Sequence, residues 1–229
     1  MHFIVIEGID HSGKDTQVAK LGERLIHCGL ETRMFHFPNY DSVTGRIISD
    51  HLHDKIVLAA RETSRLSSIL LKPQASPHDA MVFQCVQTCD KYAVAPEISK
   101  ALRAGQMVIC NRWWQSSCVY GMDDGIDPLW LMAVQANLPQ AGLNILLDLD
   151  PEEAAGRATE PGDRYESDLP KQKRLRESYL NLWHEQGKEH GDAYWKVVPA
   201  SGSAAEIHEQ IVSHMKDTLW YLKYPPKML

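Results

Sequence analysis

The sequence predicts an α/β fold, in which a doubly wound parallel sheet of about five strands is flanked by helices. Three observations predict it. Short runs of consecutive apolar residues recur along the chain, as is typical of parallel strands buried on both faces. Longer stretches with a helical spacing of apolar residues separate these runs, so each connection can cross over the sheet. A loop bounded by glycines follows the first run directly, as in a phosphate-binding turn.

The first apolar run, residues 3–6, leads into the loop GIDHSGK at residues 8–14. This loop has the glycine and lysine spacing of the P-loop, which places the predicted fold among the P-loop NTPases. The two glycines allow successive backbone amides to face phosphate oxygens, and the following helix presents its positive end to the same anion. We therefore expect the bound ATP phosphates to be held by Gly8, His11, Ser12, Gly13, Lys14, Asp15 and Thr16.

One position departs from the full motif. A serine or threonine normally follows the lysine, because its hydroxyl binds Mg²⁺. Here that position is Asp15, and Thr16 comes one residue late. A chance match or a loop that has lost its metal is the simple alternative, but the strand, loop and helix context favours a working phosphate site.

The remaining elements follow in order. Gly29 is a typical C-terminal stop for the first helix, and Pro96 should interrupt or bend the longest one. The segment 54–77 is irregular, and a surface helix with a loop is favoured there over a substrate lid. We expect strands at 3–6, 32–37, 106–110, 143–149 and 195–198, and helices at about 14–27, 45–52, 80–104, 127–136, 151–157, 169–190 and 204–222.

Length and composition limit the class of protein. With 229 residues, no internal repeat and no low-complexity linker, the chain is expected to form a single domain, residues 1–229. A net charge of −6 argues against nucleic acid or an anionic membrane as the main partner. The five cysteines form no CxxC pair, so we expect reduced thiols and a cytoplasmic protein. Met1 leads straight into the first predicted strand, so no signal peptide is expected.

Five segments, in the same order along nearly the whole chain, resemble the thymidylate kinase family of nucleoside monophosphate kinases. The combination is specific, because it joins a P-loop containing an acidic residue, a Phe-Pro after the second strand, a DRY-like triplet after the third, and an arginine-containing stretch ending in Asp-Arg-Tyr-Glu. The segments are FIVIEGIDHSGKDTQ, FHFPNYDSVTGRI, DKYAVAPEISKALRAGQMVICNRWWQSSCVYG, LNILLDLDPEEAAGRATEPGDRYE and VVPASGSAAEIHEQI.

The resemblance implies transfer of the γ-phosphate of ATP, with Mg²⁺, to a deoxynucleoside monophosphate. Negative charge spreads over the moving phosphoryl oxygens, so cations and hydrogen-bond donors are the groups that catalysis needs. A lid at about residues 156–168 would close over ATP and exclude water. By this resemblance the catalytic residues are Lys14, Arg112, Arg157 and Arg164.

The resemblance also places an acceptor pocket. Asp10 would accept the 3′-hydroxyl of the sugar, and Tyr120 would crowd out a 2′-hydroxyl, which favours deoxyribonucleotides. Trp113 and Trp114 are expected to keep the far side of this pocket aromatic. The implied pocket residues are Asp10, Phe37, Pro38, Tyr40, Phe83, Gln87, Lys91, Arg112, Ser116, Ser117 and Tyr120.

Several of these positions depart from the family pattern. Tyr40 replaces an arginine, Gln87 replaces the aromatic residue that stacks on thymine, and Lys91 replaces an arginine without offering its bidentate fork. The accepted base is therefore left open between thymine and another, such as a 5-substituted uracil. His11 stands where one branch of the family has arginine, and a charged histidine on phosphate and a plain loop residue remain equal alternatives.

The DRY triplet is Asn111-Arg112-Trp113 here, so the usual carboxylate after the third strand is an amide. We hypothesise that Asp15 supplies the missing charge near Mg²⁺, directly or through water, with Asn111 as a weak ligand. Two unrelated changes, or a catalytically dead nucleotide-binding protein, are the alternatives. Family members are commonly homodimers, and the resemblance implies the same here.

Overall fold

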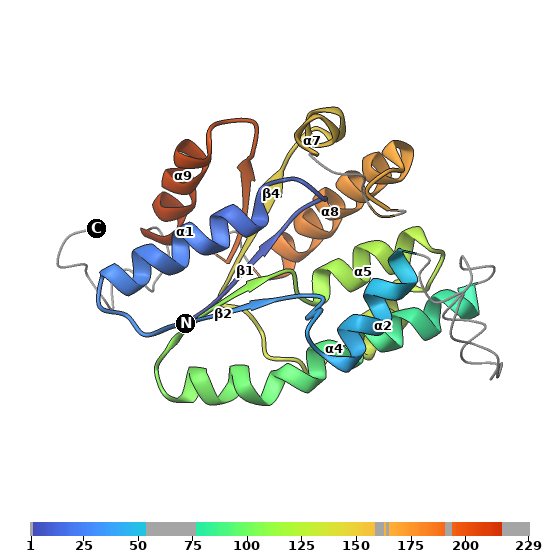
Figure 1. The fold of residues 1–229 in the computed structure, drawn as a ribbon, viewed down its shortest axis with the longest axis horizontal. Coiled ribbons are helices and arrows are strands. Elements are labelled where there is room, and N and C mark those ends of the chain that lie inside the picture. The colour runs from blue at the N-terminus through green and yellow to red at the C-terminus, as the bar shows by residue number, and fades with distance from the viewer. Residues whose placement is uncertain (1, 54–76, 159–162, 164, 191–193, 217–229) are drawn as a thin grey trace.

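The computed structural model describes residues 2–53, 77–158, 163, 165–190 and 194–216. It contains a five-stranded parallel sheet with the strand order β2-β3-β1-β4-β5 (Figure 1). The prediction of a doubly wound parallel sheet is confirmed. Arg164, the segment 54–76 and the expected end of the last helix beyond residue 216 lie outside the described residues.

The strands are β1 (Phe3–Glu7), β2 (Thr32–His36), β3 (Met107–Asn111), β4 (Leu143–Asp148) and β5 (Trp195–Pro199). β1, in the centre, and β3, beside it, are buried along their whole length, as their continuous apolar runs predict. Ile6 lies opposite Asn111 and His36 lies opposite the same residue from the other side. The ends of β2, β1 and β3 therefore meet at one edge of the sheet.

The helices match the expected order, with two differences. Trp114–Asp123 forms a helix, α5, that the sequence analysis did not predict, and α4 runs through Pro96 without a break. Of the two outcomes expected at Pro96, the interruption is therefore wrong, and a bend stays a prediction. The helices are α1 (Lys14–His27), α2 (Val43–Leu52), α4 (Pro77–Arg103), α5 (Trp114–Asp123), α6 (Pro128–Ala133), α7 (Pro151–Arg157), α8 (Leu169–His190) and α9 (Ala204–Lys216).

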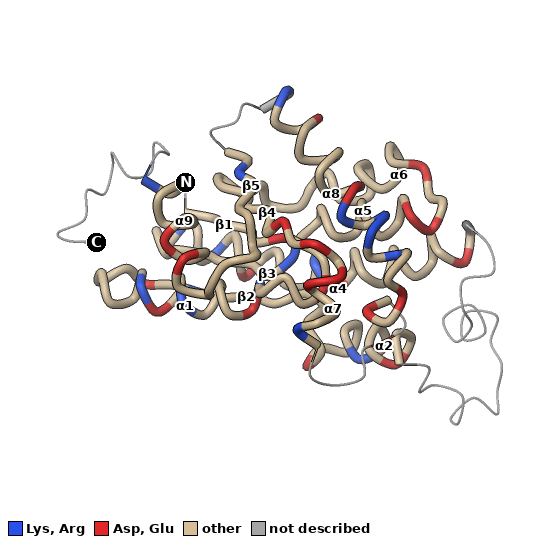
Figure 2. Tube along the Cα trace, turned by 90° about the horizontal axis from the view of Figure 1, so that it is seen from above, with Lys and Arg blue, Asp and Glu red and all other residues tan. Residues whose placement is uncertain are grey.

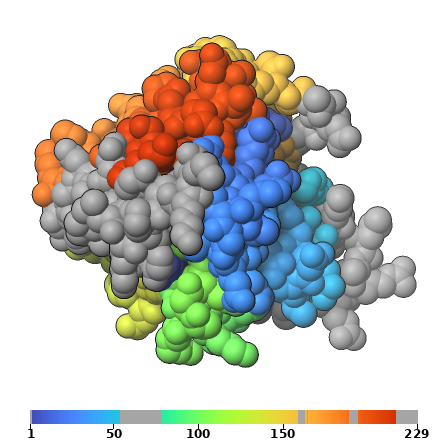
Figure 3. All heavy atoms as spheres, turned by 90° about the vertical axis from the view of Figure 1, so that its left-hand side faces the viewer, coloured from blue at the N-terminus to red at the C-terminus, as the bar shows by residue number. Residues whose placement is uncertain are grey.

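Helices cover both faces of the sheet (Figure 1). Helices α1 and α9 pack together on one face, and α4, α5 and α8 pack in succession on the other. Figure 3 shows α1, in blue, beside α9, in red, and an Arg24–Glu209 ion pair of 2.6 Å joins them. Helix α2 packs on α4.

Charged residues of both signs are interspersed over the helices and loops of the described chain (Figure 2). One cluster ties α5 to α8, because Lys171 Nζ lies 2.7 Å from Asp123 and 2.9 Å from Asp124. Arg174 adds a second contact to Asp123. In the part of the chain that the structure describes, no helix is long and apolar enough to cross a membrane.

Candidate active site

Two adjoining cavities open at the carboxyl edge of the sheet, the edge at which open α/β sheets bind ligands. The larger cavity lies over the P-loop, and the smaller cavity lies between α2, α4 and α5. Including the space open to solvent, the larger cavity encloses about 1570 Å³ and the smaller about 600 Å³.

The P-loop adopts backbone conformations that curl it around an anion site. Gly13 has a φ of 94° and His11 a φ of 57°, both in the left-handed region. Gly8 is required for space as well, because a Cβ there would lie 2.7 Å from the carbonyl oxygen of Leu147. Lys14 Nζ donates to the carbonyl oxygen of Ile9 at 2.6 Å, so the lysine folds over the loop. These residues line or shape the larger cavity.

The environment of Lys14 lowers the pKa of its ammonium group to about 7. Burial is the largest cause, and the positive charge of Arg112 acts in the same direction. The carboxylates of Asp10, Asp15 and Glu7 act in the opposite direction. A phosphate bound at the P-loop would add further negative charge and favour the charged form of Lys14.

Asp15 and Asn111 are in direct contact. Asn111 Nδ2 donates to Asp15 Oδ1 at 2.6 Å, and His36 Nδ1 lies 3.2 Å from the same oxygen. The hydrogen bond with His36 is the largest cause that holds the pKa of Asp15 below its usual range, so the carboxylate is ionised at neutral pH. His36, at the end of β2, was not anticipated as a site residue. Its position opposite Asn111 in the sheet is the signal that could have found it.

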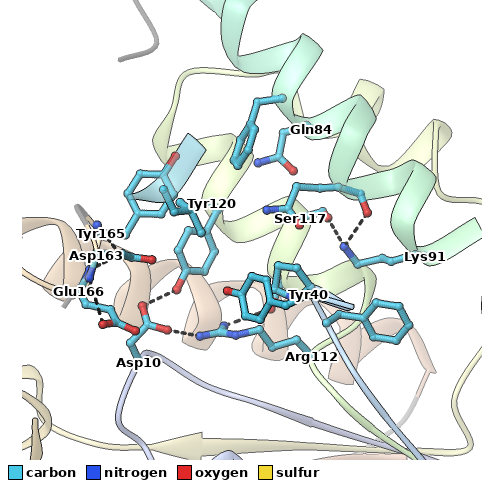
Figure 4. A pocket seen from close by; sticks show the side chains of 16 residues that line it. Asp10, Tyr40, Gln84, Lys91, Arg112, Ser117, Tyr120, Asp163, Tyr165 and Glu166 are labelled. Carbon is cyan, nitrogen blue, oxygen red and sulfur yellow. Dashed lines mark hydrogen bonds and ion pairs between the residues drawn. The ribbon is translucent and has the colours of Figure 1, made fainter. Parts of the chain in front are cut away.

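Arg112 lies where the two cavities meet, and it lines both. Its Nη1 donates to the carbonyl oxygen of Gly8 at 3.1 Å, and its Nη2 donates to Asp10 Oδ1. Asp10 also accepts from Tyr120 at 2.9 Å (Figure 4) and from Gln172 at 3.0 Å. Burial raises the pKa of Asp10, but the charges of Arg112 and Lys14 and the hydrogen bonds from Gln172 and Tyr120 together hold it below its usual value.

The smaller cavity brings together the residues expected at the acceptor pocket, from four separate segments. Figure 4 shows Tyr40, Lys91, Arg112 and Tyr120 around the same space. Phe83, Gln87, Ser116 and Ser117 complete the α4 and α5 walls. All of the expected pocket residues line this cavity: Asp10, Phe37, Pro38, Tyr40, Phe83, Gln87, Lys91, Arg112, Ser116, Ser117 and Tyr120.

Lys91 is buried, and its Nζ donates to Ser117 Oγ at 2.8 Å and to the carbonyl oxygen of Gln87 at 3.3 Å. Burial is the largest cause that lowers the pKa of Lys91 to about 8, and Glu7 and Asp90 act in the opposite direction. A cation held in this way at the floor of a cavity is suited to an anionic group of a small ligand.

Asp90, the neighbour of Lys91 on α4, fixes the loop that precedes α2. One carboxylate oxygen accepts from the amide of Asn39 at 2.7 Å, and the other accepts from the hydroxyls of Ser42 and Thr44, each at 2.7 Å. Ser42 in turn caps α2 by accepting from the amide of Gly45 at 2.8 Å. Asp90 therefore positions the wall of the smaller cavity that carries Tyr40.

Trp113 and Trp114 do not take the positions expected of them. Trp113 is fully buried against Phe3 and Phe37, and Trp114 packs against Trp195. Neither lines either cavity as the described residues define them. The expectation of an aromatic far side is therefore wrong for these two residues. An apolar pair directly after a buried strand is better accommodated by the core.

One of the two expected lid arginines lies at the larger cavity. Arg157, the last residue of α7, lines the larger cavity and donates to Glu153 and to the carbonyl oxygen of Ala200, both at 2.7 Å. Arg164 lies outside the described residues. The P-loop and the end of the lid approach each other, because His11 Nε2 lies 3.7 Å from Glu166.

Several residues at the cavities were not anticipated. Gln84 is buried in the wall of the smaller cavity, and its Oε1 has no hydrogen-bond partner among the described residues. Asp163, Tyr165 and Glu166 also line that cavity. The Asp-Arg-Tyr-Glu motif at 163–166 carried the resemblance, so its own side chains were the signal for these three.

The described residues contain no group of three or more His, Cys, Asp or Glu side chains that could hold a metal ion by themselves. Two oxygen atoms at the larger cavity are nevertheless suited to a hard cation. Asp15 is ionised and faces the cavity, and Asn111 Oδ1 is buried without a hydrogen-bond partner among the described residues. Mg²⁺ is commonly bound by one or two such ligands together with substrate phosphates and waters.

Comparison with known proteins identifies the family. The family model described as thymidylate kinase matches residues 6–211. The chain belongs to the thymidylate kinase family. A probable thymidylate kinase of Pyrococcus abyssi is 32% identical over 221 residues, which cover 95% of this chain and 97% of that protein. The thymidylate kinase of Arabidopsis thaliana is 28% identical, over 91% of this chain and 68% of its own length.

The fold of a solved thymidylate kinase agrees with this assignment. The Candida albicans enzyme superimposes with a TM-score of 0.74 at 21% identity, covering 94% of this chain and 92% of its own. The resemblance that the sequence analysis reported is therefore confirmed at the level of the family.

Proposed function

We propose that this member of the thymidylate kinase family transfers the γ-phosphate of ATP to dTMP, giving dTDP and ADP. The observation that carries the proposal is the junction of the two cavities. Asp10 and Arg112 line both, so a donor over the P-loop and an acceptor in the smaller cavity would meet at a buried arginine. A protein that only binds one nucleotide would not need a second cavity that adjoins the first.

The chemistry follows from the charges at this junction. Phosphoryl transfer depends on positioning and on neutralising the charge on the equatorial oxygens. Lys14 would hold the β- and γ-phosphates, and Arg112 would bridge the acceptor phosphate and the transferring group. Lys91 would neutralise the acceptor phosphate from the other side, and Arg157, with Arg164 of the lid, would complete the donor site.

Mg²⁺ would be held by Asp15, directly or through water, with Asn111 Oδ1 as a weaker ligand. The bound ion would neutralise charge on the β- and γ-phosphates. The hydrogen bond between Asp15 and Asn111 supports the hypothesis that the two departures from the family pattern act as one unit. His36, on the same carboxylate, would keep it oriented toward the cavity.

The acceptor side supports a deoxyribonucleotide. Asp10 would accept the 3′-hydroxyl, and Tyr120, whose hydroxyl bonds Asp10, would have its ring beside the sugar. A second acceptor, a 2′-deoxyuridine monophosphate with a polar 5-substituent, is favoured by the two amides in the base wall. Gln87 and Gln84 offer hydrogen bonds where the family pattern places an aromatic ring.

The deciding experiment is an ADP-release assay with ATP, Mg²⁺ and single monophosphates: dTMP, dUMP, 5-hydroxymethyl-dUMP, dCMP, dGMP and dAMP. We expect turnover with dTMP, and the ratio of kcat/KM between dTMP and 5-hydroxymethyl-dUMP decides between the two acceptors. An Arg112→Lys variant should keep nucleotide binding and lose most turnover. Binding of ATP without turnover on any monophosphate would contradict the proposal.

A homodimer and a cytoplasmic location remain proposals that the family resemblance supports. Sedimentation equilibrium of the full chain tests the first, and fractionation of cells tests the second.

A further inference from the structure

Glu7, the last residue of β1, is fully buried directly beneath the junction of the two cavities. Four donors surround its carboxylate. One oxygen accepts from the amides of Trp113 at 2.7 Å and Ser116 at 3.3 Å, and the other accepts from the hydroxyls of Ser116 at 2.6 Å and Tyr179 at 3.1 Å. A buried carboxylate is costly unless such donors satisfy it, so this arrangement is specific.

The two hydroxyls also contact Arg112. Arg112 Nη1 lies 3.3 Å from Ser116 Oγ and 3.2 Å from the Tyr179 oxygen. A guanidinium can only donate, so both oxygens must offer it a lone pair. The two hydroxyl oxygens also lie 2.9 Å apart. Ser116 donates its one proton to Glu7, and Tyr179 donates its own to Glu7 or to Ser116, so both oxygens keep a lone pair for Arg112. The Glu7 carboxylate thus orients the two hydroxyls so that they accept from Arg112.

Arg112 needs such support because its backbone is strained. Its φ of 64° lies in the left-handed region, which costs an ordinary residue free energy unless the surroundings fix it. The amide of Trp113, the residue after Arg112, donates to Glu7 and so fixes the backbone at this point. The same carboxylate thus fixes the backbone on one side of Arg112 and its guanidinium on the other.

We propose that Glu7 is a positioning residue for phosphoryl transfer, which acts through Tyr179 and Ser116 to hold the Arg112 guanidinium at the junction of the two cavities. The proposal rests on the role of Arg112 in the proposed function. Glu7 and Tyr179 line neither of the two cavities, so their loss should change kcat while leaving the affinity for ATP intact.

The kinetic test uses Tyr179→Phe, which removes the hydroxyl and keeps the packing, and Glu7→Gln, which exchanges an acceptor oxygen for a donor. We expect kcat to fall about tenfold in Tyr179→Phe and at least as far in Glu7→Gln, with the KM for ATP changed less than about twofold. The matched control is Gln115→Met, because Gln115 is equally buried on α5 and bonds Asn144 at 2.8 Å away from Arg112. The control should lose stability and keep kcat.

A double-mutant cycle separates positioning from a structural role. If Tyr179 acts through Arg112, then Tyr179→Phe should cost less than about twofold in an Arg112→Lys background. An equal loss of kcat from Tyr179→Phe in the wild-type and Arg112→Lys backgrounds overturns the proposal. A fall of kcat in Gln115→Met as large as in Tyr179→Phe also overturns it, because loss of stability alone would then explain the effect.

A second measurement does not depend on turnover. The Arg112 Nη–H groups, which bond Ser116 and Tyr179, should give a distinct, slowly exchanging signal in ¹⁵N NMR of the full chain, assigned by its loss in Arg112→Lys. The signal should persist in Gln115→Met and move to the position of solvent-exposed arginines in Tyr179→Phe and Glu7→Gln. If the wild type shows no kinase activity but the signal behaves in this way, the proposed function fails and the positioning of Arg112 stands. An unchanged signal in Tyr179→Phe contradicts the positioning itself.

Discussion

At the scale of single residues, the two clearest departures from the family pattern, Asp15 and Asn111, are in direct contact. The Asn111 amide donates to the Asp15 carboxylate, whereas an aspartate at position 111 would repel it, so the pair carries one negative charge beside the P-loop lysine. An ionised Asp15, bonded to His36 as well, lies at the larger cavity, where the metal and phosphates of a donor nucleotide would lie.

The exchange hypothesis predicts that Asp15→Ser lowers kcat/KM at least tenfold, because the carboxylate near Mg²⁺ is lost. The double variant Asp15→Ser with Asn111→Asp should recover most of the rate, since it recreates the usual pattern. Steady-state kinetics over a range of Mg²⁺ concentrations measure both. Glu209→Ser, which removes an exposed carboxylate paired with Arg24 on the far helices, is the control and should change nothing. An unchanged rate in Asp15→Ser refutes the hypothesis.

Lys91 predicts a pH dependence of acceptor binding. Because burial lowers its pKa to about 8, Lys91 is charged at pH 7 and loses its proton as the pH rises through 8. The KM for dTMP should therefore rise by roughly tenfold between pH 7 and pH 9.

Lys91→Arg provides the control for this effect. A guanidinium stays protonated throughout the range, so the pH profile of the KM for dTMP should become flat, whatever its absolute value. A profile that rises equally in Lys91→Arg assigns the titration to another group and contradicts the prediction.

Site residues that belong to a motif were predicted well from the sequence, and residues whose position depends on tertiary packing were predicted poorly. The P-loop and the pocket residues were anticipated, because the loop spacing and the resemblance name them directly. Glu7 was missed because it ends an apolar strand and looks like an ordinary strand terminus. Trp113 was misplaced because the sequence does not show whether an aromatic residue after a strand turns inward or toward a ligand.

At the scale of elements, α2 and the loop before it depend on a side chain from α4. Asp90 bonds Asn39, Ser42 and Thr44, and Gly45 leaves no room for a side chain, because a Cβ there would lie 1.8 Å from the Asn39 carbonyl oxygen. The loop is thus held in one conformation against α4, and it presents Tyr40 to the smaller cavity.

Asp90→Ala should therefore lower the free energy of unfolding by about 2 kcal/mol and also raise the KM for dTMP severalfold. Urea denaturation and steady-state kinetics measure the two effects. Asp127→Ala is a matched control, because Asp127 caps α6 by accepting from the amides of Leu129 and Trp130. The control should lose about 1 kcal/mol without altering the KM. A similar rise of the KM in both variants contradicts the assigned role of Asp90.

The unpredicted helix α5 shows why some elements escape a reading of the sequence. Its residues, WQSSCVYGMD, include serine, tryptophan, tyrosine and glycine, which have low or middling helix propensity. The helix forms because its first amides are satisfied by the Glu7 carboxylate and because seven of its residues are buried against its neighbours. These are tertiary contacts, which local patterns cannot reveal. The strands were predictable because buried parallel strands consist of continuous apolar runs, which are visible in the sequence.

At the scale of the whole molecule, the five-stranded sheet brings residues that are far apart in the chain to one edge. Asp10 follows β1, Arg112 follows β3, and Gln172 comes from α8, yet all three are hydrogen-bonded to one another through Asp10. A parallel, doubly wound sheet follows from the alternation of strands and helices in the sequence. The closeness of α8 to the P-loop does not, since it depends on how helices pack across the sheet.

Two separate binding sites predict two separable effects on thermal stability. ATP with Mg²⁺, or dTMP, each at about 100 times its dissociation constant, should stabilise the fold by about 2.7 kcal/mol. For a chain of this size the melting temperature should rise by roughly 5–11 °C. Differential scanning calorimetry measures the shifts. Lys14→Met should lose most of the ATP shift and keep the dTMP shift. Loss of both shifts together indicates one shared site and contradicts the prediction.

The 2.6 Å contact between Asp15 and Asn111 also bears on how such a sequence could arise from the usual family pattern. Starting from a P-loop hydroxyl and a strand-end aspartate, one order of substitution passes through two facing carboxylates, and the other passes through a serine facing an asparagine with no charge at all. Either intermediate would bind Mg²⁺ and ATP less well, so the two codons are expected to change nearly together. An ancestor reconstructed with either mixed pair should then be a poor catalyst.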